Sequence, residues 1–188
     1  IVMTIRIDGK SLTIEDIIKV CRDYEKVEIT EEAKAAVNKS RDYVRGKLEN
    51  DAVIYGLTTG FGRFANVKIS YEETAQLQKN LIISHTCSMG NPYPKHYVRA
   101  AMLLRCNNLT RGFSGIRLST IQTMVDMLNA DIVPIVPEKG SVGSSGDLAP
   151  LSCIALGLIG QGMVEYKGNV IEAKEAFKDA GLTPVELA

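Results

Sequence analysis

Residues 140–151 read GSVGSSGDLAPL, a run of small residues that leads into an apolar segment. The inner Ser144-Ser145-Gly146 can be read as the precursor of an electrophile made from the backbone itself. Ring closure requires the amide nitrogen of Gly146 to press onto the carbonyl carbon of Ser144, an approach that only a residue without Cβ makes easily. Loss of water from the ring and of the Ser145 hydroxyl would leave an exocyclic methylidene conjugated with an imidazolone. This chemistry therefore requires a serine at the middle position.

A loop rich in glycine and serine also has plainer uses. It can be a linker or a phosphate-binding turn before a helix, with Asp147 as N-cap and Pro150 in the first turn. The stretch lacks the Gly-Lys-Ser/Thr of a Walker loop, the G-x-G-x-x-G dinucleotide fingerprint and the G-x-S-x-G nucleophile elbow. From the residues of this loop alone, two interpretations stay open: a structural turn and a cofactor precursor.

Composition is that of an ordinary globular protein. The 188 residues are 45% hydrophobic and 23% charged, enough for one core. Lys plus Arg and Asp plus Glu both number 22, and no basic run is interleaved with aromatic residues. We therefore expect neither nucleic acid nor a membrane as partner, and a small, nearly neutral ligand fits better. The apolar stretches are too short to span a bilayer and the first residues lack a signal-peptide pattern, so we expect a cytoplasmic protein.

The cysteine and histidine pattern argues against a metal site. The four cysteines are dispersed without a C-x-x-C pair, and the chain has only two histidines. Reduced, buried thiols are the expected state of these cysteines in a cytoplasmic protein.

Hydrophobic periodicity predicts a mainly α-helical chain with small β-hairpins. One hairpin is expected from residues 4–7 and 11–12 around the Asp8-Gly9 turn, and another from residues 163–166 and 170–171. A capping box at Thr13 and a cap at Ser114 are expected to begin two of the helices. The predicted helices cover residues 13–24, 30–48, 70–85, 98–109, 118–128, 148–159 and 172–180.

Three charged or titratable side chains are given structural roles by their surroundings. Arg105 is placed on the apolar stripe of its helix, where a paired or snorkelling side chain is expected. His96 is placed in a surface loop near two prolines. His85 falls on one helix face with two leucines, four and eight residues earlier.

The stretch 140–151 resembles the signature of the aromatic amino acid ammonia-lyases, the histidine and phenylalanine ammonia-lyase family. Three further stretches carry the same resemblance in the family's order: residues 55–62 (YGLTTGFG), 77–85 (LQKNLIISH) and 108–115 (NLTRGFSG). One position departs, because Ser144 stands where the family usually has alanine. The side chain at this position would be only a substituent on the ring, so the hydroxymethyl group of serine should be tolerated there.

The resemblance implies an activity, a cofactor and site residues. Ser144, Ser145 and Gly146 would form methylidene-imidazolone autocatalytically. Tyr55 would be the catalytic tyrosine that removes the β-proton of the substrate, although by itself it could equally anchor a turn. Ser84 and His85 occupy the substrate-selectivity pair and resemble the histidine enzymes. A buried imidazole needs a polar partner, so the implied reaction is elimination of ammonia from L-histidine to give urocanate, a step of histidine catabolism.

The resemblance also implies a fold, the mainly α-helical aspartase/fumarase-like fold, of which residues 3–188 would be the N-terminal part without the C-terminal helical bundle. The full-length parent would be a homotetramer acting on a small amino acid, and Arg111 would form a structural or inter-subunit ion pair, because the family's carboxylate-binding arginine lies in the C-terminal part. For the chain as it stands we expect self-association, no lyase activity and an uncyclised loop. Open alternatives are a phenylalanine or tyrosine ammonia-lyase, an aminomutase of the same family, and a non-catalytic assembly fragment.

Overall fold

Helices dominate the chain, as the hydrophobic periodicity predicted. The computed structural model describes residues 4–49, 54, 71–140 and 148–187. Over these residues the helices are α1 (Ile14–Arg22), α2 (Glu31–Glu49), α3 (Tyr71–His85), α4 (Lys95–Leu109), α5 (Leu118–Ala130), α6 (Leu148–Leu158) and α7 (Ala173–Ala180). The strands are β1 (Thr4–Ile7), β2 (Lys26–Ile29), β3 (Met89–Pro92), β4 (Val133–Pro134), β5 (Pro137–Lys139), β6 (Met163–Tyr166) and β7 (Asn169–Glu172).

The N-terminal hairpin predicted from residues 4–7 and 11–12 is wrong. Strand β1 pairs instead with β2, in parallel and across α1. The Asp8 carboxylate accepts hydrogen bonds from the Lys10 and Ser11 amides at 2.7 and 2.8 Å, and this turn directs the chain into α1 rather than back along β1. The helix then begins as predicted, because Thr13 forms a capping box with Asp16.

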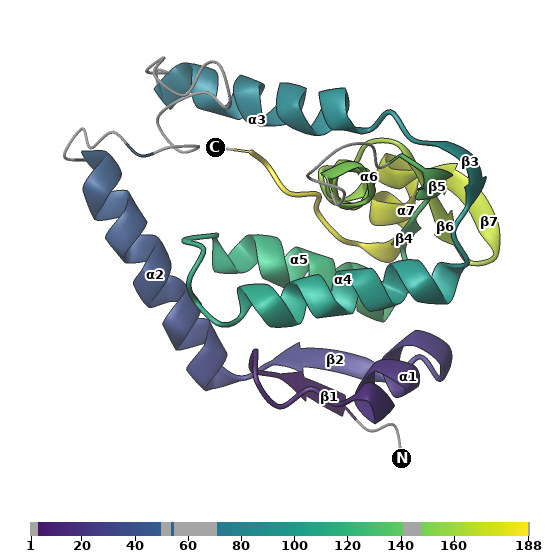
Figure 1. Ribbon diagram of the computed structural model, residues 1–188, viewed down its shortest axis with the longest axis horizontal. Coiled ribbons are helices and arrows are strands. Elements are labelled where there is room, and N and C mark those ends of the chain that lie inside the picture. The colour runs from purple at the N-terminus through teal and green to yellow at the C-terminus, as the bar shows by residue number, and fades with distance from the viewer. Residues whose placement is uncertain (1–3, 50–53, 55–70, 141–147, 188) are drawn as a thin grey trace.

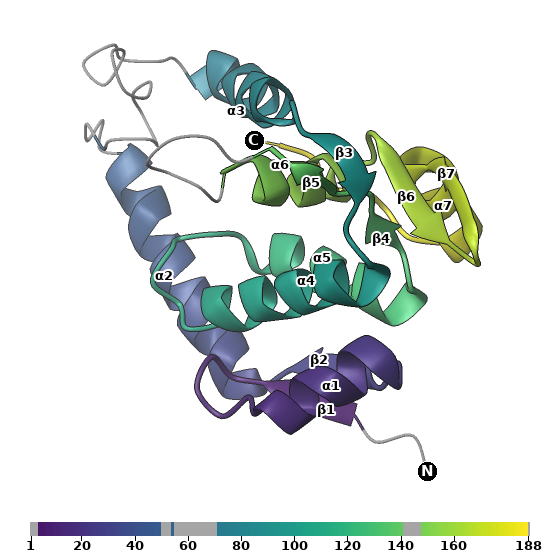
Figure 2. The ribbon, with the colours of Figure 1, turned by 45° about the vertical axis from the view of Figure 1, so that its right-hand side comes forward.

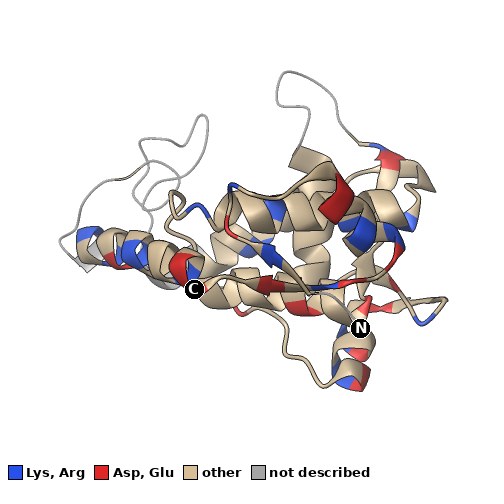
Figure 3. Ribbon diagram, turned by 90° about the horizontal axis from the view of Figure 1, so that it is seen from below, with Lys and Arg blue, Asp and Glu red and all other residues tan. Residues whose placement is uncertain are grey.

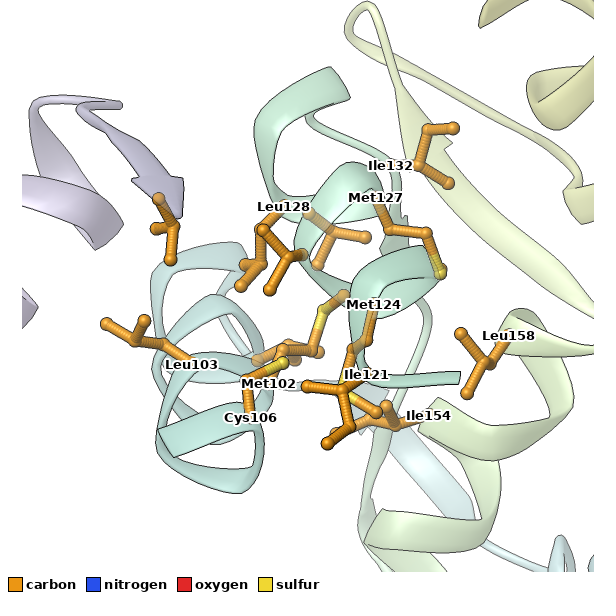
Figure 4. Packing of buried hydrophobic residues seen from close by; sticks show 14 of the residues in the cluster. Met102, Leu103, Cys106, Ile121, Met124, Met127, Leu128, Ile132, Ile154 and Leu158 are labelled. Carbon is orange, nitrogen blue, oxygen red and sulfur yellow. The ribbon is translucent and has the colours of Figure 1, made fainter. Parts of the chain in front are cut away.

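The core lies between α4, α5 and α6 (Figure 4). Helices α4 and α5 run side by side, with the β1–α1–β2 unit against one side of them and α6 on the other (Figures 1 and 2). Their facing side chains are almost fully buried, as the predicted apolar stripes require. The central members are Met102, Leu103, Cys106, Ile121, Met124, Met127, Leu128, Ile154 and Leu158.

One buried cation joins α1, α4 and α5. Arg99 is 1% exposed, and its guanidinium donates to the carbonyl oxygens of Val20 (2.7 Å) and Leu128 (3.0 Å) and to the Asp131 carboxylate (2.9 Å). The Val20 carbonyl belongs to the last turn of α1, where carbonyls lack helical partners. Lys95 also contacts Asp131, at 2.7 Å. Arg99 therefore caps α1 from within the core.

The C-terminal third forms a small sheet covered by a helix. Strands β6 and β7 form the predicted hairpin, and β4 pairs with β6 on the other side. Helix α7 buries Ala173, Ala176 and Phe177 and ends at Gly181, whose φ of 67° is in the left-handed region that glycine favours.

Three placements from the sequence need correction. Helix α5 is capped by Arg117 without a side-chain hydrogen bond, while Ser114 is exposed in the preceding loop. His96 lies in the first turn of α4 rather than in a loop. The charged residue on the buried stripe of α4 is Arg99, whereas Arg105, two helical turns along, is exposed. The apolar face of a helix is narrow, so a small error in the assumed angular position of its centre assigns a flanking residue to the wrong face.

Charge is spread over the surface without a dominant sign (Figure 3). Among the described helices, none combines the length and the apolar character that a bilayer crossing needs.

Candidate active site

The predicted selectivity pair lies at the last turn of α3, a helix that packs along α6 (Figure 1). Leu77, Leu81 and His85 are all half-buried, in agreement with their predicted common face. The Nδ1 atom of His85 lies 2.8 Å from the carbonyl oxygen of Leu81. Because a carbonyl oxygen only accepts, Nδ1 is the donor in this contact. In the tautomer that carries its proton on Nδ1, the Nε2 atom is a hydrogen-bond acceptor.

Ser84 shares this arrangement. Its hydroxyl donates to the same Leu81 oxygen at 2.9 Å and lies 3.1 Å from Nδ1 of His85. The two side chains therefore converge on one backbone carbonyl at the end of the helix. The pair presents an exposed hydroxyl and an imidazole whose orientation is fixed by its own helix.

Strands β3 and β5 connect this helix end to the start of the 140–151 stretch. The two strands are antiparallel, with Met89 opposite Lys139. Strand β3 follows α3 after three residues, and β5 leads directly into Gly140. The helix end that carries His85 and the base of the glycine-rich stretch are therefore neighbours, although more than fifty residues separate them in sequence.

The other candidate site residues lie outside the described residues: Tyr55, Ser144, Ser145 and Gly146. Their predicted roles stay predictions. What the structure describes is the far end of the same stretch, where α6 begins at Leu148 with Pro150 in its first turn, as expected.

Two apolar cavities that the sequence did not indicate flank α6. The first, about 350 Å³, lies between α6, α5 and the end of the described chain, and Ile82 of α3 and Arg105 of α4 reach it. The second, about 270 Å³, lies between α6 and α4 and is lined by Tyr93 and Tyr97. These two tyrosine side chains are 41% and 57% exposed. Hydrophobic periodicity, which identifies buried helix faces, does not indicate such exposed aromatic residues.

None of the four cysteines forms a disulfide, and three of them are buried as expected, whereas Cys87 is not. Cys21, Cys106 and Cys153 lie in or beside the core, whereas Cys87 is exposed between α3 and β3. Burial raises the pKa of the Cys106 thiol to about 12, so this group stays protonated at neutral pH. Within the part of the chain that the structure describes, no group of three His, Cys, Asp or Glu side chains could hold a metal ion.

The chain belongs to the aromatic amino acid lyase family, whose sequence profile matches residues 12–188. Its helical fold is that of the solved ammonia-lyases and aminomutases. The ergothioneine-degrading enzyme ergothionase from Treponema denticola superposes with a TM-score of 0.94 at 31% identity, over 99% of this chain and 37% of that one. The phenylalanine aminomutase of Pantoea agglomerans gives 0.91 at 34% identity, over 99% and 36%.

Among proteins of assigned activity, the chain is similar to histidine ammonia-lyases. It is 50% identical over 182 residues to the histidine ammonia-lyase of Caldanaerobacter subterraneus subsp. tengcongensis. That match covers 97% of this chain and 36% of the relative. The chain thus spans little more than a third of the length of the relatives it matches.

Proposed function

We propose that the whole protein is a histidine ammonia-lyase, which eliminates ammonia from L-histidine to give urocanate. The observation that carries this proposal is the identity of 47 to 51% with several histidine ammonia-lyases over nearly the whole chain. The Ser84-His85 pair at the end of α3 supports the same choice of substrate.

His85 would recognise the substrate's imidazole ring. Its Nδ1 is bonded to Leu81, so the free Nε2 lone pair can accept a hydrogen bond from an imidazole N–H. Phenylalanine has no polar atom on its ring, and its binding would leave Nε2 without a partner once water is excluded. The pair would thus favour histidine by satisfying a polar atom that phenylalanine leaves unsatisfied.

Ser144, Ser145 and Gly146 would form the methylidene-imidazolone group. The described residues on either side fit this use, because Gly140 is packed so closely that no Cβ would fit, and α6 starts at Leu148. The described residues on both sides of residues 141–147 are therefore fixed by packing or by helix formation. The group supplies an electrophilic methylidene for the substrate amine, and Tyr55 would take the β-proton. Assembly as a homotetramer and a cytoplasmic location belong to the same proposal.

Two alternatives share the fold and would differ in products. A phenylalanine or tyrosine ammonia-lyase would release cinnamate or coumarate, and an aminomutase would return a β-amino acid. A non-catalytic assembly role would give no product at all. The test is to express the whole protein and compare kcat/KM for L-histidine, L-phenylalanine and L-tyrosine from the ultraviolet absorbance of the three acids. We expect a strong preference for histidine, and equal or greater activity on phenylalanine would overturn the proposal.

A matched pair of serine variants tests the proposed origin of the cofactor. Ser145→Ala removes the hydroxyl whose loss creates the methylidene, so turnover should vanish while the melting temperature barely changes. Ser144→Ala is the control, because that side chain only becomes a ring substituent and activity should persist. Intact mass gives an independent readout, since ring formation removes two waters. Wild-type turnover in Ser145→Ala would show that the stretch is no cofactor precursor.

A further inference from the structure

Phe113, in the connection between α4 and α5, is the most exposed large apolar side chain in the described part of the chain. It is 82% exposed. The guanidinium carbon of Arg111 lies 5.4 Å from the centre of its ring, so a cation covers one face of the ring. Aromatic residues and arginine are enriched at the centres of protein–protein interfaces. Phe113 therefore has the character of an interface side chain.

The backbone on both sides of Phe113 is fixed, because the α4–α5 connection lies against α2 (Figures 1 and 2). A Cβ built on Gly112 would lie 2.6 Å from the carbonyl oxygen of Ala36. The Gly115 amide donates to the Ser40 Oγ at 3.0 Å. Both glycines have a positive φ, 74° and 66°, which a residue with a Cβ rarely adopts. The ring is thus held outward on an ordered loop, and a partner that binds it has little loop entropy to remove.

A pocket of about 280 Å³ opens beside this ring, between the turn after β1, the first turns of α2 and the end of α4. Its floor includes Ala33 and Thr110, which are 4% and 1% exposed. More exposed charged side chains form its rim: Asp8, Lys10, Glu32 and Arg111. An apolar cavity of about 150 Å³ is enough to bind benzene. The pocket therefore has room for a phenyl ring.

Arg111 joins the pocket to the exposed ring, because it lines the pocket and its guanidinium lies over the ring of Phe113. Ring and pocket are therefore neighbours on one face of the molecule. In a two-fold contact the same patch of both copies meets, so each ring faces the pocket of the other copy when the axis passes between ring and pocket. The rim carries two acidic and two basic side chains, so two identical rims meet without net repulsion.

We propose that Phe113 of each copy inserts into this pocket of a second copy, so that the α4–α5 connection and the first turns of α2 form a two-fold contact. The inference rests on the homotetramer of the proposed function, and it names a surface for that assembly. It does not depend on the substrate or on the cofactor. A small apolar centre surrounded by a charged rim is the arrangement found in specific interfaces.

The first test removes the ring in the whole protein and measures assembly by sedimentation velocity over a dilution series. Burial of one phenyl ring accounts for roughly 10- to 100-fold in a dissociation constant. Symmetry places two rings in the contact, so Phe113→Ser should raise its dissociation constant at least about 100-fold. Species with fewer copies should appear at concentrations where the wild type stays assembled.

Tyr43→Ser is the matched control for this variant. Tyr43 is 67% exposed on α2, and the Lys47 Nζ lies 5.4 Å from the centre of its ring, so it is also an exposed aromatic residue beside a cation. It does not line the pocket. Its replacement should leave the assembly unchanged.

The second test changes the charge of the rim. Lys10→Glu leaves three acidic side chains and one basic, and Glu32→Lys leaves three basic and one acidic. Each variant alone should weaken the assembly, most strongly at low salt, because two identical charged rims then repel each other. The double variant has a neutral rim again and should assemble better than either single variant.

A third test asks which residues meet. Two differently tagged copies are co-expressed in a Cys87→Ser background, one with Phe113→Cys and the other with Lys10→Cys. A short bismaleimide should join the two tags, because position 113 of one copy lies at the pocket rim of the other. Tyr43→Cys in place of Phe113→Cys should give little of this product.

Several outcomes would overturn the inference. Wild-type assembly of Phe113→Ser at every concentration would show that the ring is not in a contact between copies. A lower melting temperature of Phe113→Ser with unchanged assembly would show that another segment of the same polypeptide covers the ring. A monomeric wild type would refute both this contact and the proposed homotetramer. An assembled wild type that responds to the variants as expected but makes no urocanate would refute the proposed reaction and support the contact.

Discussion

Replacing His85 by leucine in the whole protein measures what one ring nitrogen contributes to the choice of substrate. Nδ1 is bonded to the Leu81 carbonyl oxygen at 2.8 Å, so Nε2 is the nitrogen left to contact the substrate. Leucine has a similar size and no hydrogen-bonding atom. A histidine substrate bound beside it would keep a buried imidazole N–H without a partner. We therefore expect activity on L-histidine to fall relative to activity on L-phenylalanine.

The magnitude follows from one unpaired polar group. An unsatisfied buried donor costs about 1 to 3 kcal/mol, and each 1.4 kcal/mol is about tenfold in rate. The ratio of kcat/KM for histidine over phenylalanine should therefore fall roughly 5- to 150-fold. The Nδ1 bond is also lost, but it lies within the last turn of α3. Its loss should appear as a lower melting temperature and not as a change of specificity.

Two further variants at the same position separate the two nitrogens. In His85→Asn the amide nitrogen can take the place of Nδ1 and bond Leu81, while nothing reaches the position of Nε2. In His85→Gln the amide oxygen can reach the Nε2 position and accept the substrate N–H. Asparagine should therefore behave like leucine in specificity, and glutamine should keep most of the preference for histidine. The opposite ranking, measured from urocanate and cinnamate absorbance, would refute the assignment of Nε2 to the substrate.

Three more predictions concern stability and thiol chemistry. Arg99→Met should lower the free energy of unfolding of the chain by about 1 to 3 kcal/mol, because it leaves the buried Val20 carbonyl without its donor. Denaturant titration measures this change. Replacing the exposed Arg105 by Met is the control and should change the free energy little, so equal effects of the two variants would refute the capping role of Arg99. Cys87 should react first with a thiol reagent at pH 8, since it is exposed. The pKa of the buried Cys106 thiol is raised to about 12 from 9.0, so stability should fall as pH rises through that range, when the unfolded chain releases this proton and the folded chain keeps it. A Cys106→Val variant with an unchanged slope there would contradict this.

Short-range signals in the sequence predicted the elements that depend on few neighbours. The capping box of Thr13 and Asp16 and the glycine that ends α7 are read within four residues, and both are present. The β6–β7 hairpin likewise needs only its own turn. Each of these features is stabilised largely by atoms that are close in sequence, which is why periodicity and capping rules find them.

The features that the sequence did not reveal depend on partners far along the chain. Arg99 is charged, and nothing next to it in sequence indicates that it will meet carbonyls of α1 and α5 in the core. The parallel pairing of β1 with β2 depends on the Asp8 turn and on α1 packing against α4, so a local Asp-Gly signal pointed to the wrong partner. Tertiary packing overrides local propensity in both cases.

The β3–β5 ladder shows why a motif names site residues without explaining how they are held. Its strands read MGNP and PEK, and glycine, proline and asparagine are residues that strands disfavour, so no strand is expected there. Yet this ladder sets Ser88 against Gly140 and so joins the His85 end of α3 to the base of the 140–151 stretch. The constraint is steric and acts on position 140, because the Ser88 side chain occupies the space that any side chain there would need. A residue under such a constraint carries no chemical signature, so it can be found only from the packing of the folded chain.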